Sequence, residues 1–243
     1  MLNKLLLIWG ASSFLVLQLW CAENIPIKYT RDDWGGTPIT WVEDSRLPLF
    51  NLVIYFADGA LSDGEQKGAT HTMFEMLPAG TDKLSREAIQ EQYEFYGAEF
   101  NAKVLHEYSM ISLKGLVKDL IPLVERTCEV FTSANFPENE LKKENERAKS
   151  AILNLVGAHD RLANNAFREL SIGLTPFKYP VEPKFKDLDL INNKILMDKR
   201  NYFKSNVAKR IYLSGPKQVL QIKDIIMQKC GFLTTQKLFV REE

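Results

Sequence analysis

Residues 68–81, GATHTMFEMLPAGT, indicate a short helix that ends in a Gly-Thr turn. His71 and Glu75 lie four residues apart, so they share one face of that helix. Met73 and Met76 fall on another side, where they predict contact with a hydrophobic core. A histidine and a carboxylate at this spacing are ligand types that bind zinc, so the stretch is a candidate metal site.

Strands and helices alternate on both sides of this stretch. Strands are expected within residues 26–30, 38–44, 47–61, 98–115 (a pair with its turn near His106) and 207–215. Helices are expected within residues 84–97, around Cys128, and within 136–160, 161–173, 190–206 and 216–231. This order predicts an α+β fold in which helices pack on a mainly antiparallel sheet. Since no linker interrupts the pattern, residues 23–243 are expected to form a single domain.

Three stretches together carry a family resemblance: residues 68–81, then GAEFNAKVLHEYS at 97–109, then PENELKKENERAKSAILNL at 137–155. In this order they resemble the N-terminal half of the pitrilysin/insulinase zinc peptidases. The resemblance implies a domain like those of pitrilysin and the mitochondrial processing peptidase. Such a domain is one half of the family's usual two, and the second half helps to complete the active site.

The helix at residues 68–81 departs from the family's motif, which is His-x-x-Glu-His. When Gly80 and Thr81 are aligned with the Gly-Thr that ends that helix, His71 falls on the first zinc ligand. Phe74 falls on the general base and Glu75 on the second ligand. Phenylalanine cannot accept a proton from a zinc-bound water, so the pattern predicts a degenerate site without catalytic residues.

The resemblance places the third ligand about two helical turns beyond the pair Glu146-Arg147, at Leu153. Leucine cannot bind zinc, which leaves His71 and Glu75 as the remaining metal-binding candidates. A third donor could come from Glu144, Glu146, His159 or Asp160, and no spacing favours one of them. We therefore expect no bound cofactor, with zinc at His71 and Glu75 as the alternative. His106, in a solvated turn, and His159, past a helix end, are interpreted as structural.

Asn101 and Ala102 match the family's Asn-Ala strand, which lies beside the substrate. The resemblance therefore implies that these residues bind peptide through main-chain hydrogen bonds, although Asn101 could simply satisfy a backbone group. We expect a non-catalytic domain that binds peptide or pairs with a complementary pitrilysin-like chain, which could be a second copy. The alternatives are an active zinc metallopeptidase with atypical ligands and a membrane-anchored structural subunit.

The N-terminus predicts export. Lys4 precedes an uncharged run from residue 5 to residue 22, which is typical of a signal peptide and is short for a membrane span. Residues 1–22 are thus expected to direct the protein to the periplasm or cell envelope. An uncleaved anchor or acylation at Cys21 are alternatives, and membrane contact is expected only through this segment. A net charge of +0 argues against nucleic-acid binding.

Cys128 and Cys230 each continue an apolar helical stripe. This placement favours two buried core thiols. The alternative is a disulfide between them, which an exported protein can form.

Overall fold

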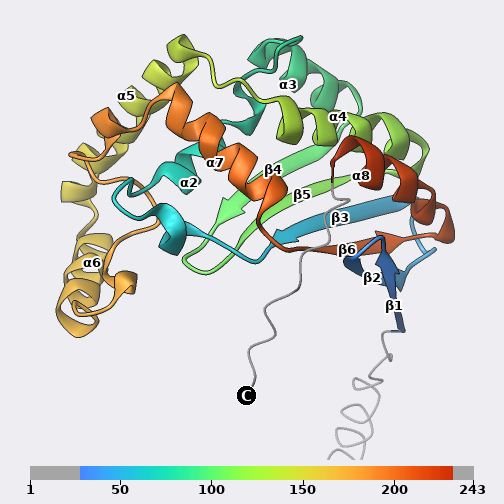
Figure 1. Cartoon of the computed structure of the whole chain (residues 1–243), viewed down its shortest axis with the longest axis horizontal. Helices are drawn as coiled ribbons and strands as arrows, with labels where there is room; N and C mark the ends of the chain where they lie inside the picture. Colours follow the sequence, from blue (N-terminus) through green and yellow to red (C-terminus); the bar gives the residue numbers. More distant parts are fainter. Residues whose placement is uncertain (1–27, 232–243) are drawn as a thin grey trace, which may run out of the picture.

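The computed structural model describes residues 28–231, which form a six-stranded sheet with helices packed on it (Figure 1). The predicted export segment, residues 1–22, and Cys21 lie outside the described residues. None of the helices formed by residues 28–231 combines the length and the apolar character that a bilayer crossing requires.

The sheet has the strand order β1-β2-β6-β3-β5-β4, with β4 at one edge. Only the β2–β6 pairing is parallel among the pairings of the described strands, so the predicted mainly antiparallel α+β fold is confirmed. The strands are β1 (Tyr29–Trp34), β2 (Thr37–Glu43), β3 (Leu49–Phe56), β4 (Glu99–Val104), β5 (Ser109–Leu116) and β6 (Lys209–Gly215).

Helices cover one face of this sheet (Figure 1). In β3 the side chains of Phe50, Leu52, Ile54 and Phe56 point toward them, and each is at most 1% exposed. This period of two fits a strand with one buried face. The helices are α2 (Ala69–Glu75), α3 (Arg86–Phe95), α4 (Leu120–Ser133), α5 (Glu138–Asn154), α6 (His159–Ser171), α7 (Asn193–Ser205) and α8 (Lys223–Lys229).

Local signals predicted several boundaries correctly. The Ser85 side chain accepts a hydrogen bond from the backbone N–H of Ala88 and begins α3. Gly97 follows its end with φ of 58°, a conformation that favours glycine. The predicted helix at residues 216–231 is wrong in part, because a 3-10 helix (Lys217–Ile222) precedes the short α8. The first strand also runs further than expected, to Trp34.

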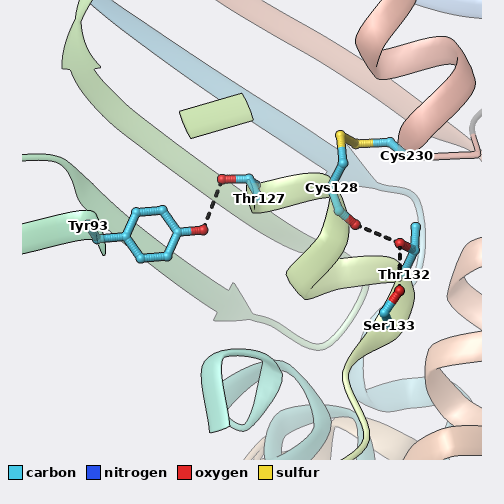
Figure 2. Close-up of a disulfide and its surroundings, with 6 residues drawn as sticks. All are labelled: Tyr93, Thr127, Cys128, Thr132, Ser133 and Cys230. Atoms are coloured by element: carbon cyan, nitrogen blue, oxygen red, sulfur yellow. Dashed lines mark hydrogen bonds between the residues drawn. A yellow bond between two sulfur atoms is a disulfide. The ribbon is translucent and has the colours of Figure 1, made fainter. Parts of the chain in front are cut away.

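Cys128 and Cys230 form a disulfide, so the preference for two free thiols is wrong (Figure 2). The bond joins α4 to the residue that follows α8, across a sequence separation of 102 residues. Both cysteines are 0% exposed, so the inference of burial was correct. The apolar stripes indicated that each cysteine faces the core, but they could not show that the two meet there.

Lys209 is a buried lysine at the start of β6. Because of this burial we predict that the stability of the protein depends on pH. Its Nζ donates to the carbonyl oxygens of Lys204 and Val207 at 2.7 and 2.8 Å. Burial lowers the pKa of Lys209 from 10.5 to about 8. Between these values the unfolded chain binds the proton and the folded chain does not, so stability rises with pH. This pKa shift corresponds to a rise of roughly 3 kcal/mol in the free energy of unfolding between pH 7 and pH 10.5. Unfolding the protein at each pH measures this rise.

The Lys209→Met variant is expected to lack this rise, whereas Lys194→Met, on the exposed side of α7, should retain it. A Lys209→Met variant whose unfolding free energy follows the same pH curve as the parent protein would contradict the assignment.

Candidate functional site: a cleft beside α2 and the edge strand β4

A buried carboxylate positions the start of α2. Asp63 accepts hydrogen bonds from the backbone N–H groups of Gly68 and Thr70, at 3.0 and 3.1 Å, and from the Thr70 hydroxyl at 2.5 Å. Its other partner is Lys199 of α7, with Nζ at 2.9 Å. These bonds satisfy N–H groups that a helix start leaves without intrahelical partners, so they fix the orientation of α2. Sequence reasoning missed this residue, which appeared to belong to a polar loop.

The Pro-rich loop, residues 179–189, lies against the same helix start. Gly68 has φ of 83°, and a Cβ atom there would come within 2.5 Å of Pro183. A side chain at this position would therefore push the loop away from α2. Because the loop lies so close to the start of α2, it lines the same cleft as His71, which is three residues after Gly68.

A cleft of about 500 Å³ lies between α2, α5, α6 and the Pro-rich loop. His71 and Glu144 both line it, and the Glu144 carboxylate accepts a hydrogen bond from Arg147 at 2.9 Å. Glu75 is exposed and does not line this cleft. The structure thus places only the first of the two candidate zinc ligands in the cleft.

Phe74, at the position of the general base, points into the core. It is 1% exposed, and its ring centre lies 5.1 Å from that of Phe203 and 5.5 Å from that of Phe56. Both contacts are edge-to-face arrangements that favour aromatic pairs. A proton acceptor at this position would be surrounded by hydrocarbon instead of facing a bound water.

The expected third ligand position is also removed from the cleft. Leu153 is 65% exposed and does not line it, while Ala151 and Ile152 of α5 do. Within residues 28–231, no group of three or more His, Cys, Asp or Glu side chains is arranged to hold a metal ion. The donors present do not fit a zinc site, which needs three protein ligands and an open position in this chemistry.

The peptide-binding candidates Asn101 and Ala102 lie on β4, at the edge of the sheet. The Asn101 side chain is exposed, and Ala102 is partly buried against the core. No strand other than β5 pairs with β4 in the part of the chain that the structure describes. The outer edge of β4 is thus the place where an extended peptide could add a strand.

The other histidines were placed only partly correctly. His106 is partly buried instead of solvated, and its Nε2 lies 2.9 Å from the carbonyl oxygen of Tyr179. His159 follows the helical turn that ends at Gly157, as expected, and it also begins the next helix, α6. Sequence reasoning also missed that α6 brings Arg161 and Arg168 toward His106. The available signal was their separation by seven residues, which places both on one face of a helix.

Comparison with known proteins identifies the family. Residues 43–178, more than half of the chain, match the model of the family described as Insulinase (Peptidase family M16). The chain belongs to the insulinase family, M16. The resemblance inferred from the motifs is therefore confirmed.

The relatives of this M16 chain include proteins named as inactive. A Non-peptidase homolog YmxG from Helicobacter pylori is 26% identical over 140 residues, which are 57% of this chain and 32% of that protein. An Uncharacterized zinc protease YmxG from Bacillus subtilis is 26% identical over 117 residues, 48% of this chain and 29% of that protein. This chain therefore matches about a third of the length of these curated relatives.

A solved M16 structure shows the same fold. The crystal structure of a peptidase M16 inactive domain from Pseudomonas fluorescens matches with a TM-score of 0.80 and 20% sequence identity. The match covers 89% of this chain and 53% of that chain. At this identity the likeness establishes the fold alone, so the site has to be judged from the residues present here.

Proposed function

We propose that this protein is an exported, non-catalytic M16 domain that binds an extended peptide along β4 and pairs with a complementary M16-like chain. The observation that carries the proposal is the position of Phe74, which puts a core side chain where the chemistry needs a carboxylate. The family scaffold is retained around it, including the open edge of the sheet.

The hydrogen-bonding pattern of β4 supports peptide binding at Ala102. The Leu105 N–H donates to the Tyr108 carbonyl oxygen at 2.8 Å, so this opposed pair is hydrogen-bonded. Such pairs alternate along an antiparallel ladder, so the backbone groups of Lys103 and Asn101 point toward β5. Those of Ala102 point away from β5, toward the free edge. A peptide strand could therefore bond to Ala102 without disturbing the sheet.

Pairing and export rest on separate observations. The matched part is 53% of the solved M16 chain, so that protein holds a further stretch of similar length, and we propose a complementary M16-like chain as its counterpart here. Such a partner could be a complementary M16-like chain or a second copy. The N-terminal uncharged run and the buried disulfide both favour an oxidising compartment such as the periplasm.

The Ala102→Pro variant tests peptide binding at β4. Proline removes an N–H that faces the free edge, so the sheet should remain intact. Loss of a main-chain bond to the peptide is expected to weaken binding about tenfold. Fluorescence anisotropy with short labelled Thr/Ser/Val-rich peptides measures the affinity, and denaturant unfolding checks the fold. The Asn51→Ala variant is the control, since Asn51 is an exposed residue of β3, which lies inside the sheet and away from its β4 edge.

Two results would contradict the proposed function. A folded Ala102→Pro variant that binds as tightly as the parent protein would remove the edge-strand mechanism. Cleavage of the same peptides that a chelator stops and His71→Ala abolishes would show that the protein is an enzyme.

A further inference from the structure

Positively charged side chains gather at the C-terminal end of β4. Lys103 on β4 and Arg161 and Arg168 on α6 line one pocket of about 400 Å³, together with His106 from the β4–β5 turn. Asn164 and Asn165 of α6 line the same pocket. It adjoins the cleft that contains His71, because Arg161 and Arg168 line both.

Some cations of the protein pair with carboxylates, and these three do not do so within residues 28–231. Arg86 and Arg126, for example, pair with carboxylates at 2.6 and 2.5 Å. Across residues 28–231, no carboxylate lies within ion-pair distance of Lys103, Arg161 or Arg168. Glu182 also lines the pocket but is exposed. Three cations against one solvated carboxylate leave the pocket with net positive charge, which an anion would reduce.

The hydrogen bonds of His106 leave donors of Arg168 available. His106 Nε2 lies 2.9 Å from the Tyr179 carbonyl oxygen and 3.4 Å from Arg168 Nη1. A carbonyl oxygen only accepts, so Nε2 carries the proton in the shorter contact and has no lone pair for Arg168. The Arg168 guanidinium therefore presents N–H groups at the pocket without an acceptor at His106. A carboxylate is the acceptor that fits a guanidinium best.

The turn that carries His106 is held firmly in place. Leu105 and His106 accept hydrogen bonds at their carbonyl oxygens from the N–H groups of Ala60 and Leu61, each at 2.9 Å. A Cβ atom at Gly59 would come within 2.2 Å of the Leu105 oxygen, so the two segments touch directly. The pocket therefore has one wall that is fixed before any ligand binds, which lowers the entropic cost of binding.

We infer that this pocket binds a carboxylate of the peptide that lies along β4, so the protein selects acidic peptides. The inference rests on the proposed function, because Lys103 is the residue that follows Ala102 on that strand. A peptide parallel to β4 would bring its C-terminal carboxylate to the pocket. An antiparallel peptide would instead place an acidic side chain near its N-terminal end there.

Binding of one labelled peptide in several forms tests the inference. The neutral form has only uncharged side chains and an amidated C-terminus. The first acidic form has the same sequence with a free C-terminal carboxylate, and the second is amidated and carries a glutamate near its N-terminus. One of the two acidic forms is expected to bind about tenfold more tightly than the neutral form, and which one it is reports the strand direction. The Arg168→Gln and Arg161→Gln variants should reduce this preference to about twofold or less, with little effect on the neutral form.

The matched control is Arg210→Gln, an exposed arginine on β6 outside this pocket, which should retain the preference. If all forms bind equally and Ala102→Pro weakens each of them, the carboxylate pocket is wrong and the edge-strand function stands. A preference that survives Arg168→Gln combined with Arg161→Gln would also overturn the pocket. If no form binds the parent protein, the proposed function fails and the inference fails with it.

Discussion

Replacing Phe74 with glutamate is expected to destabilise the protein strongly instead of restoring a peptidase. The side chain is 1% exposed and packs edge-to-face against Phe56 and Phe203. Losing a buried phenylalanine costs about 3–5 kcal/mol, and a carboxylate in the same place adds the cost of burying a charge without a partner. A loss of more than about 4 kcal/mol is expected in the free energy of unfolding, against a typical total of about 5–15 kcal/mol. Denaturant titration followed by circular dichroism measures it.

Two companion variants separate packing from chemistry. Phe74→Leu keeps an apolar side chain and should lose less than half as much stability as Phe74→Glu. Glu75→His changes an exposed residue and should alter stability by about 0.5 kcal/mol or less. Combining Phe74→Glu with Glu75→His completes the His-x-x-Glu-His motif, yet no chelator-sensitive cleavage is expected because α5 presents Ala151 and Ile152 to the cleft. Stable folding of Phe74→Glu would show that the position does not belong to the core.

The fold could be predicted from the sequence wherever local signals agree with tertiary packing. The helix α3 has its cap at Ser85 and its stop at Gly97, and both signals lie within the segment that they define. The β4–β5 pair follows from alternating apolar residues around a short turn. The division of the last helix was missed, because an apolar stripe does not distinguish a 3-10 turn from an α-helix over so few residues.

The candidate site was less predictable, because its parts come from distant segments. The motif placed Phe74 at the position of the general base, but only the structure shows that its ring packs in an aromatic cluster with Phe203. The role of Asp63 in positioning α2 was not evident from the sequence. Its partner Lys199 lies far along the chain, and only the fold brings the two side chains together. The pocket at the end of β4 joins Lys103 to Arg168, and no local pattern in the sequence connects these residues.

The disulfide gives the second large prediction: removing it should cost about 3–4 kcal/mol of unfolding free energy. The bond closes a loop across 102 residues, and the loss of chain entropy in the unfolded state grows with loop length. It also holds α8, a helix of seven residues, which is too short to be stable without tertiary contacts. The variant Cys128→Ala with Cys230→Ala keeps both buried positions apolar, so it removes the covalent link with little polar disturbance. Denaturant titration with and without reductant measures the effect.

The reductant provides an internal control for this prediction. The parent protein should lose stability when reductant is added, and the double alanine variant should be insensitive to it. Hydrogen exchange should locate the loss mainly at α8 and the preceding 3-10 helix, since the ion pair between Lys229 and Glu125 at 2.6 Å is exposed and cannot replace a covalent bond. If the parent protein unfolds at the same denaturant concentration in both conditions and both thiols react with an alkylating reagent, the bond does not form in solution. The buried disulfide would then no longer support the proposed export, which would rest on the N-terminal segment alone.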